Sequence, residues 1–243
     1  MKFTLRARLT AEFLGTAFLV AAVVGSGVMG EKLSGGNVAI ALLANTIATG
    51  AALVALILAF GAISGAHFNP VVSLSEAIGG GLSWRDATAY ATVQIAGGIA
   101  GAVVAHLMFG IPVISLSRHA RQGSALVLSE FIATFGLLMV ILGCSRFRLS
   151  MVPIAVGSYI TAAYWFTAST SFANPAVTIA RSLSNTFAGI RPIDVPLFLS
   201  AQIAGGLAAT FLFRRFKTPE GNSQTKKTAA RVLLRDDIGG VNP

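Results

Sequence analysis

A short pattern built on Asn-Pro occurs twice in this 243-residue chain, at residues 67–73 (HFNPVVS) and 172–178 (FANPAVT). Each copy follows a long apolar stretch and a loop of small residues, and about two turns of helix-compatible sequence come after it. Asn is favoured immediately before a helix, and Pro is tolerated at the first helical position, where its missing N–H costs nothing. Each copy therefore predicts a loop that leads directly into the N-terminus of a short helix.

Two further pairs of segments repeat in the same order as the Asn-Pro pattern. Residues 11–16 (AEFLGT) correspond to residues 129–134 (SEFIAT), and the pentapeptide QIAGG at 94–98 recurs unchanged at 202–206. Matched segments in matched order indicate an internal duplication, which determines the architecture more strongly than any single motif. We therefore expect two similar halves.

The apolar stretches are long enough to cross a lipid bilayer. The chain is 54% hydrophobic and only 11% charged, whereas soluble domains carry about 25% charged residues. A spanning helix needs roughly 20 apolar residues. We therefore predict an all-α membrane protein, in which the basic N-terminus precedes an uncleaved first span and not a signal peptide. The expected spans are 9–29, 38–63, 87–109, 125–142, 151–168 and 195–213.

The two Asn-Pro segments are too short to cross a bilayer, so we interpret them as re-entrant half-helices. Such segments are tolerated only where protein or a water-filled cavity surrounds their backbone. Three spans in each half would invert the halves, so that Asn69 and Asn174 meet near the middle of the membrane. Helix N-termini carry unpaired N–H groups and partial positive charge. This arrangement would accept neutral solutes and oppose protons and cations.

The charge distribution indicates orientation and argues against one class of partner. The formal net charge is +9, but the basic residues lie outside the apolar stretches and lack the interleaved aromatics of nucleic-acid-binding proteins. They gather near the two termini and in the loops expected on the same side, so the positive-inside rule places both termini in the cytoplasm. The single Cys144 cannot form an intrachain disulfide, and we interpret it as a small apolar filler.

On both Asn-Pro boxes, the Ser-Gly-Ala-His-Phe lead-in and the glutamate that opens each half, the chain resembles the aquaporins and aquaglyceroporins, the major intrinsic proteins. The resemblance implies a bundle of six transmembrane helices plus two re-entrant half-helices, a homotetramer with one pore per subunit, no cofactor or metal, and a bacterial inner membrane. We expect a channel domain at 1–216, with repeat one at about 9–109 and repeat two at about 125–216. Residues 217–243 are expected to form a disordered cytoplasmic tail.

The resemblance also implies roles for individual residues. In the family, the glutamates corresponding to Glu12 and Glu130 accept hydrogen bonds from the re-entrant loops, although each could instead be an interfacial carboxylate. His67 would lie near the inner mouth of the pore, or be a buried and satisfied histidine, and packing is the better interpretation of His106. The boxes expected to line the pore are Asn69, Pro70, Val71, Asn174, Pro175 and Ala176.

The chain departs from the family at the residues that set the pore width. An arginine usually follows the second box and faces an aromatic residue on the second span, but these positions fall on Val177 and Thr49. The other two constriction positions fall near Ala162 and Ser171. Arg181 lies one turn beyond Val177, where a cation favours the C-terminal end of a half-helix. We therefore expect a wide and uncharged constriction.

Such a constriction predicts a passive channel for glycerol, urea, and arsenite or antimonite as neutral trihydroxides. The chain looks most like the bacterial glyceroporin-type channels associated with arsenic resistance. A water-selective aquaporin is the first alternative. A secondary carrier is another, but carriers usually hold charged sites at the midplane, and the carboxylates within the expected spans, Glu12 and Glu130, lie near opposite ends. No hydrolase or metalloprotease motif occurs, so we do not expect an enzyme.

Overall fold

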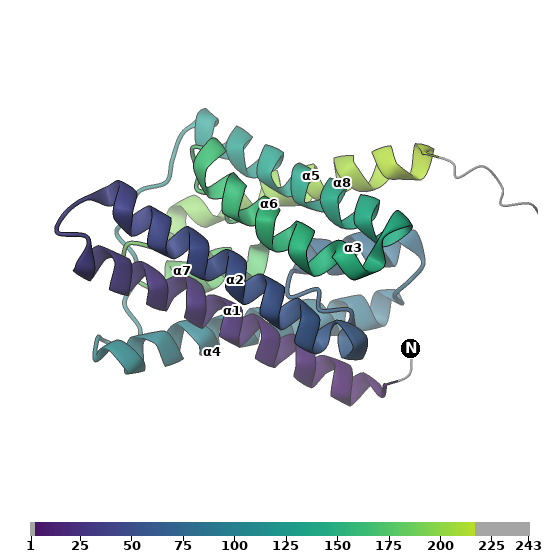
Figure 1. Ribbon diagram of the computed structural model, residues 1–243, viewed down its shortest axis with the longest axis horizontal. Coiled ribbons are helices and arrows are strands. Elements are labelled where there is room, and N and C mark those ends of the chain that lie inside the picture. Colours follow the sequence, from purple (N-terminus) through teal and green to yellow (C-terminus); the bar gives the residue numbers. More distant parts are fainter. Residues whose placement is uncertain (1–2, 217–243) are drawn as a thin grey trace, which may run out of the picture. The chain divides into compact units, whose positions relative to one another are not determined.

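The computed structural model describes residues 3–216, and every regular element in this range is helical (Figure 1). The described residues up to Phe213 form one compact unit. The expected tail at 217–243 lies outside the described residues. The elements are α1 (Leu5–Leu33), α2 (Val38–Ser64), α3 (Pro70–Gly79), α4 (Trp84–Phe109), α5 (Ser124–Phe147), η1 (Leu149–Met151), α6 (Val152–Phe166), α7 (Pro175–Ser182), η2 (Pro192–Asp194) and α8 (Val195–Arg215).

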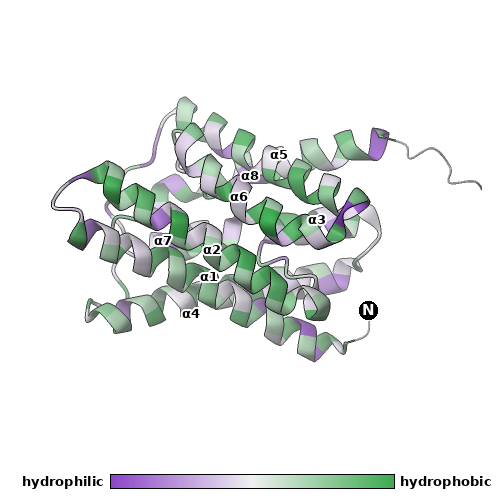
Figure 2. Ribbon diagram, in the orientation of Figure 1, coloured by the Kyte–Doolittle hydropathy of each residue, from purple (hydrophilic) through white to green (hydrophobic). Residues whose placement is uncertain are grey.

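Six helical segments in the described part of the chain have the length and composition to cross a membrane. They are α1, α2, α4, α5, the segment Leu149–Phe166 and the segment Pro192–Arg215. Hydrophobic residues extend along the length of these helices (Figure 2). The prediction of an all-α protein with six spans is therefore confirmed.

Helices α3 and α7 are the two short helices predicted from the Asn-Pro pattern, with 10 and 8 residues. Asn69 and Asn174 precede them in extended conformations, and Pro70 and Pro175 occupy the first helical positions. The side chain of Asn69 accepts a hydrogen bond from the Val71 N–H at 3.0 Å. Asn174 caps α7 in the same way, so both helices begin where the sequence predicted.

The first glycine of each QIAGG peptide joins two spans of its own half. A Cβ atom on Gly97 of α4 would lie 2.4 Å from the Phe13 carbonyl oxygen of α1. A Cβ atom on Gly205 of α8 would lie 2.3 Å from the Phe131 carbonyl oxygen of α5. Because Phe13 and Phe131 are themselves equivalent in the repeat, the same close backbone contact is built twice.

The second glycine of each peptide joins one half to the half-helix of the other. Gly98 of α4 faces α7, where a Cβ atom would lie 3.1 Å from the Ala176 carbonyl oxygen. Gly206 of α8 faces α3, where a Cβ atom would lie 2.1 Å from Cγ1 of Val71. The two halves are therefore interlocked, and each half-helix is packed against a span of the opposite repeat.

Candidate functional site

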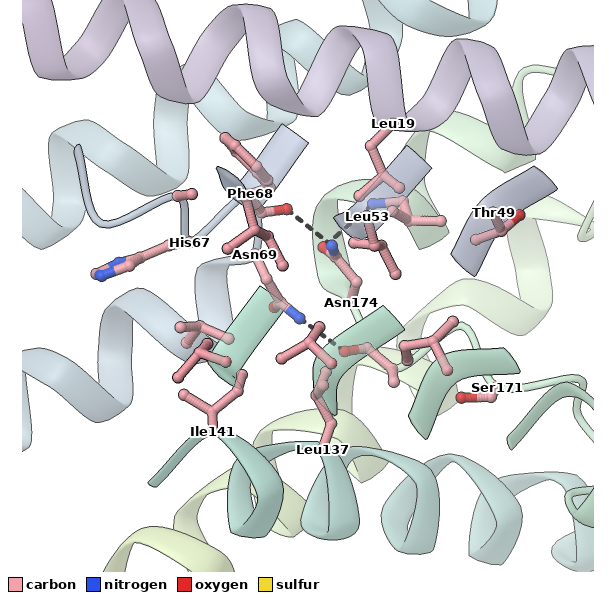
Figure 3. A pocket seen from close by; sticks show the side chains of 18 of the residues that line it. Leu19, Thr49, Leu53, His67, Phe68, Asn69, Leu137, Ile141, Ser171 and Asn174 are labelled. Atoms are coloured by element: carbon pink, nitrogen blue, oxygen red, sulfur yellow. Dashed lines mark hydrogen bonds between the residues drawn. The ribbon is translucent and has the colours of Figure 1, made fainter. Parts of the chain in front are cut away.

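A cavity of about 300 Å³ extends past the N-termini of both half-helices. Its wall is mostly aliphatic and comes from α1, α2, α3, α5, α6 and α7, together with the two loops that lead into α3 and α7. Figure 3 shows Asn69 and Asn174 in the middle of the cavity, with Thr49 and Ser171 at one end and His67 at the other. We call the first of these ends the Thr49 end. The side chains of Asn69 and Asn174 thus place polar groups in the middle of a mostly apolar cavity. We call this region the polar waist.

The two asparagines at the waist each bond the loop of the opposite half. Nδ2 of Asn69 donates to the Ala173 carbonyl oxygen at 2.8 Å, and Nδ2 of Asn174 donates to the Phe68 carbonyl oxygen at 2.8 Å (Figure 3). Each amide has a second N–H, for which the described residues show no further acceptor. The carboxamides therefore fasten the halves together and keep one donor each for a molecule in the cavity.

The other members of the two boxes do not line the cavity, which corrects the prediction for four of the six residues. Pro70 and Pro175 serve as the first residues of their helices. Val71 and Ala176 are buried and pack against the glycines of α8 and α4 described above. The reason is helical geometry, because the first two residues of each half-helix point away from the cavity, whereas the third, Val72 or Val177, lines it.

Glu12 is completely buried and holds the loop that leads into α3. Its Oε1 accepts hydrogen bonds from the Ser64 hydroxyl at 2.6 Å and from the His67 N–H at 2.9 Å. Its Oε2 accepts from the Phe68 N–H at 2.7 Å and from Nε2 of Gln94 at 2.8 Å. The carboxylate therefore satisfies four donors and fixes the position of the loop.

Glu130 repeats this arrangement in the second half and is also completely buried. It accepts hydrogen bonds from the N–H groups of Phe172 and Ala173, both at 2.9 Å, and from Nε2 of Gln202 at 2.6 Å. Both glutamates thus have the loop partners that the family resemblance implied. Gln94 and Gln202, which begin the two QIAGG peptides, bridge each carboxylate to its half-helix.

The loops that the glutamates hold contain several non-glycine residues with positive φ. Such conformations cost free energy and persist only where the surrounding structure enforces them. Here each carboxylate gathers two successive N–H groups of the loop, which favours the unusual backbone. The residues with positive φ are Ala66 (50°), Phe68 (49°), Thr170 (62°), Ser171 (49°) and Ala173 (49°).

His67 and His106 have different surroundings. His67 lines the cavity at the end opposite Thr49, with Nδ1 3.1 Å from the Ser73 hydroxyl. His106 does not line it, and its two ring nitrogens lie 2.8 Å from the Val113 carbonyl oxygen and 2.8 Å from the Ser184 hydroxyl. No group of three or more His, Cys, Asp or Glu side chains that could hold a metal ion occurs within residues 3–216.

Three of the four residues expected at the constriction line the cavity, namely Thr49, Ser171 and Val177. Ala162 does not, because it is exposed on the outer face of α6. Tyr164 of the same helix lines the cavity instead, and its hydroxyl lies 3.2 Å from the Thr49 hydroxyl. Residues two positions apart on a helix point in different directions, so a two-residue error in alignment selects the wrong face. The cavity therefore contains an aromatic ring that the sequence reasoning did not place there.

Arg181 also lines the cavity, although only 2% of its surface is exposed. Its Nε donates to the Ala188 carbonyl oxygen, and its Cζ lies 3.4 Å from the centroid of the Phe172 ring. The side chain was expected to stabilise the C-terminal end of α7. It bonds a loop carbonyl outside this helix instead. Since Arg181 lies one turn after Val177, helical spacing could have placed both on the cavity side. The prediction of an uncharged constriction is therefore wrong.

A second buried arginine comes from the loop that joins the two halves. Arg121 donates from Nε to the Gly189 carbonyl oxygen at 2.8 Å and from Nη1 to the Ser169 carbonyl oxygen at 3.1 Å. Its Cζ lies 4.9 Å from the centroid of Phe172, the ring that Arg181 also contacts. Burial lowers the pKa of Arg121 to about 10, so the side chain is still charged at neutral pH. No sequence pattern distinguished this arginine from the other basic residues of the loops.

Comparisons with known proteins agree with this geometry. The family model described as Major intrinsic protein matches residues 1–170. Aquaglyceroporin AqpS of Rhizobium meliloti (strain 1021) is 55% identical over 218 residues, covering 90% of this chain and 93% of that protein. Aquaporin NIP1-4 of Oryza sativa subsp. japonica is 34% identical over 221 residues, covering 88% and 78%. The X-ray structure of the aquaglyceroporin from Plasmodium falciparum matches with a TM-score of 0.70 at 19% identity, over 88% of this chain and 97% of that chain, and thus shares the fold.

Proposed function

Because the chain belongs to the major intrinsic protein family, we propose that it is a passive membrane channel and that its cavity is the solute pathway. The proposed solutes are glycerol and the neutral trihydroxides of arsenic and antimony. Urea and water are smaller molecules that would also permeate. The observation that carries the proposal is the pair Asn69 and Asn174, which line one cavity at the N-termini of two opposed half-helices. A relative named aquaglyceroporin at 55% identity supports the solute class.

The polar waist selects neutral molecules with lone pairs. The positive ends of α3 and α7 and the spare amide N–H groups of the two asparagines are all donors or positive dipoles. A hydroxyl oxygen can accept from them, whereas a cation meets an unfavourable potential. Glu12 and Glu130 are bonded to the loops behind this waist, and Glu76, the carboxylate that lines the cavity, lies seven residues after Asn69 on α3.

The remaining wall suits a solute that is polar on one side and apolar on the other. Small side chains stand at Thr49, Ser171 and Val177, and aliphatic side chains line most of the rest. Glycerol and the trihydroxides share this shape, with hydroxyl groups on one side of a compact body. Tyr164 and Arg181 add an aromatic ring and a cation to the wall at the Thr49 end, and these groups favour a water-selective aquaporin as the second candidate.

Flux measurements on proteoliposomes test the proposal directly. Stopped-flow light scattering compares osmotic water permeability with glycerol uptake, and arsenite uptake is then measured on the same preparation. We expect glycerol and arsenite flux well above that of empty liposomes, without saturation. Water flux alone would favour the second candidate, and saturable flux coupled to an ion gradient would indicate a carrier.

The substitution Val177→Arg tests whether this position limits solute size. An arginine there would add a long charged side chain to the cavity, so glycerol and arsenite flux should fall more than water flux. Val177→Leu provides a matched control that adds bulk without charge, and it should cause a smaller loss. Equal losses of water and glycerol in Val177→Arg would show that this position is not the constriction.

We further propose a homotetramer in a bacterial inner membrane with both termini in the cytoplasm. The tetramer rests on the family resemblance, and the orientation rests on the distribution of basic residues. Native mass spectrometry in detergent would report the number of subunits, and protease access to 217–243 in inverted vesicles would report the orientation. A monomer, or a tail cleaved only from the outside of intact cells, would contradict these assignments.

A further inference from the structure

In the described part of the chain, two guanidinium groups lie buried beside the cavity without a salt bridge to a carboxylate. Arg181 and Arg121 are 2% and 9% exposed, and the salt bridges found within residues 3–216 involve other arginines. Glu130, the buried carboxylate of this half, is already bonded to the loop amides and to Gln202. Buried charges are normally paired, because removing a charge from water is costly. Arg181 and Arg121 therefore carry positive charge at the Thr49 end without a direct ion pair to a carboxylate within residues 3–216.

The fold holds both guanidinium groups in place. Adjacent loop carbonyls, those of Ala188 and Gly189, accept from Nε of Arg181 and Nε of Arg121 respectively. Both Cζ atoms lie close to the ring of Phe172, at 3.4 Å and 4.9 Å from its centroid. Nη1 of Arg121 also donates to the Ser169 carbonyl oxygen, whereas stacking on the ring and bonding through Nε leave the outer nitrogens of Arg181 available for other acceptors.

Within residues 3–216, two buried polar atoms at this end have no hydrogen-bond partner. They are Nη1 of Arg181 and Oγ of Ser171, each buried in residues that line the cavity. Leaving a buried donor unsatisfied is unfavourable, and natural structures rarely do so without a ligand or a water. Figure 3 places Ser171 at the Thr49 end, and its neighbour Phe172 carries the Arg181 guanidinium. The two free atoms therefore belong to one region of the cavity wall.

We propose that Arg181 and Ser171 form a binding site for a small monovalent oxyanion, of which formate is the simplest probe. A planar oxyanion matches a guanidinium group in shape and charge, and a cavity of about 300 Å³ has room for it. The inference that a bound anion competes with neutral solutes rests on the proposed function, because it requires the cavity to be the pathway. The binding itself does not require any flux.

Binding is measured on the detergent-purified full chain by saturation-transfer NMR of the formate proton, with gluconate as a bulky anion at equal ionic strength. We expect formate to bind the wild type and to raise its unfolding temperature, since a ligand of the folded state stabilises it. Arg181→Met should abolish both effects, and Arg181→Lys should retain a weaker one. Arg118→Met, which removes an exposed loop cation on the same side of the protein, is the matched control and should leave binding unchanged.

Ser171→Ala is a second test, should Arg181→Met fail to fold, and it should weaken formate binding several-fold. In proteoliposomes with formate at equal concentration on both sides, glycerol uptake by the wild type should slow as formate rises, and that by Arg181→Lys should slow less. Absence of formate binding to the wild type, or unchanged binding in folded Arg181→Met or Ser171→Ala, would overturn the site. Formate binding without any glycerol flux would uphold the site and contradict the proposed channel.

Discussion

Replacing Glu130 by glutamine should loosen the loop that leads into α7. The carboxylate now accepts from the N–H groups of Phe172 and Ala173 and from Nε2 of Gln202, at 2.9, 2.9 and 2.6 Å. A glutamine side chain offers one oxygen and one amino group, so at least one of the three donors would face another donor. We expect that donor to remain unsatisfied in a site that excludes water.

The expected loss can be worked out from these bonds. A hydrogen bond to a charged group contributes about 1.5–3 kcal/mol and a neutral one about 0.5–1.5 kcal/mol, so three weakened bonds lose about 3 kcal/mol together. One unsatisfied buried donor adds about 1–3 kcal/mol. Since such terms are not additive, we expect the free energy of unfolding to fall by about 4 kcal/mol. For a chain of this size, this corresponds to a drop of about 10 °C in the unfolding temperature.

Two measurements report the effect. A thiol-reactive fluorogenic dye detects unfolding through Cys144, the one cysteine of the chain. Hydrogen exchange of peptides that cover residues 167–174 reports on the loop itself, where opening should become easier by a similar free energy. Glu31→Gln makes the same chemical change at an exposed position near the end of α1 and serves as the matched control.

An unchanged unfolding temperature and unchanged loop exchange in Glu130→Gln would refute the reasoning. That result would mean that backbone packing alone enforces the positive φ angles of the loop. Glu12→Gln tests the same argument in the other half, where the carboxylate has four donors. Its unfolding temperature should therefore fall at least as far.

Three further predictions concern packing and charge. Gly101→Ala would place a Cβ atom 2.1 Å from the Ala17 carbonyl oxygen and should lower the unfolding temperature by several degrees, whereas Gly61→Ala, with nothing within 4 Å, should not lower it. Val71→Ala should cost about 1–2 kcal/mol of stability but leave the ratio of glycerol to water flux unchanged, and an altered ratio would place Val71 in the pathway. Because burial lowers the pKa of Arg121 to about 10, while an unfolded arginine keeps its proton beyond that pH, this residue's contribution to stability should be constant from pH 6 to 8 and increase only above about pH 10. A pH series of unfolding temperatures for the wild type and Arg121→Met would reveal any earlier change.

Local and repeated features were predictable because their physics is contained in neighbouring residues. The caps at Asn69 and Asn174 follow from the preferences of Asn and Pro at a helix start. The spans follow from the length of apolar stretches. The duplication paired Glu12 with Glu130, and the family resemblance indicated what they bind. The repeated Gln-Ile-Ala-Gly-Gly peptide indicated that both halves share a structural contact. It did not reveal that its first glycine packs against Phe13 in one half and Phe131 in the other.

The wall at the Thr49 end depended on features that no local pattern records. Loop 167–174 follows α6 and runs through left-handed backbone conformations at Thr170, Ser171 and Ala173. Tyr164, not Ala162, lines the cavity, and Phe172 contacts the guanidinium groups of Arg181 in α7 and of Arg121 in the loop between the two halves. The sequence by itself determined the architecture and the polar waist, since these arise from propensity, hydrophobicity and repetition. Only the tertiary structure decided the charge and width of the passage, since these depend on how a few buried side chains meet across the interface of the two halves.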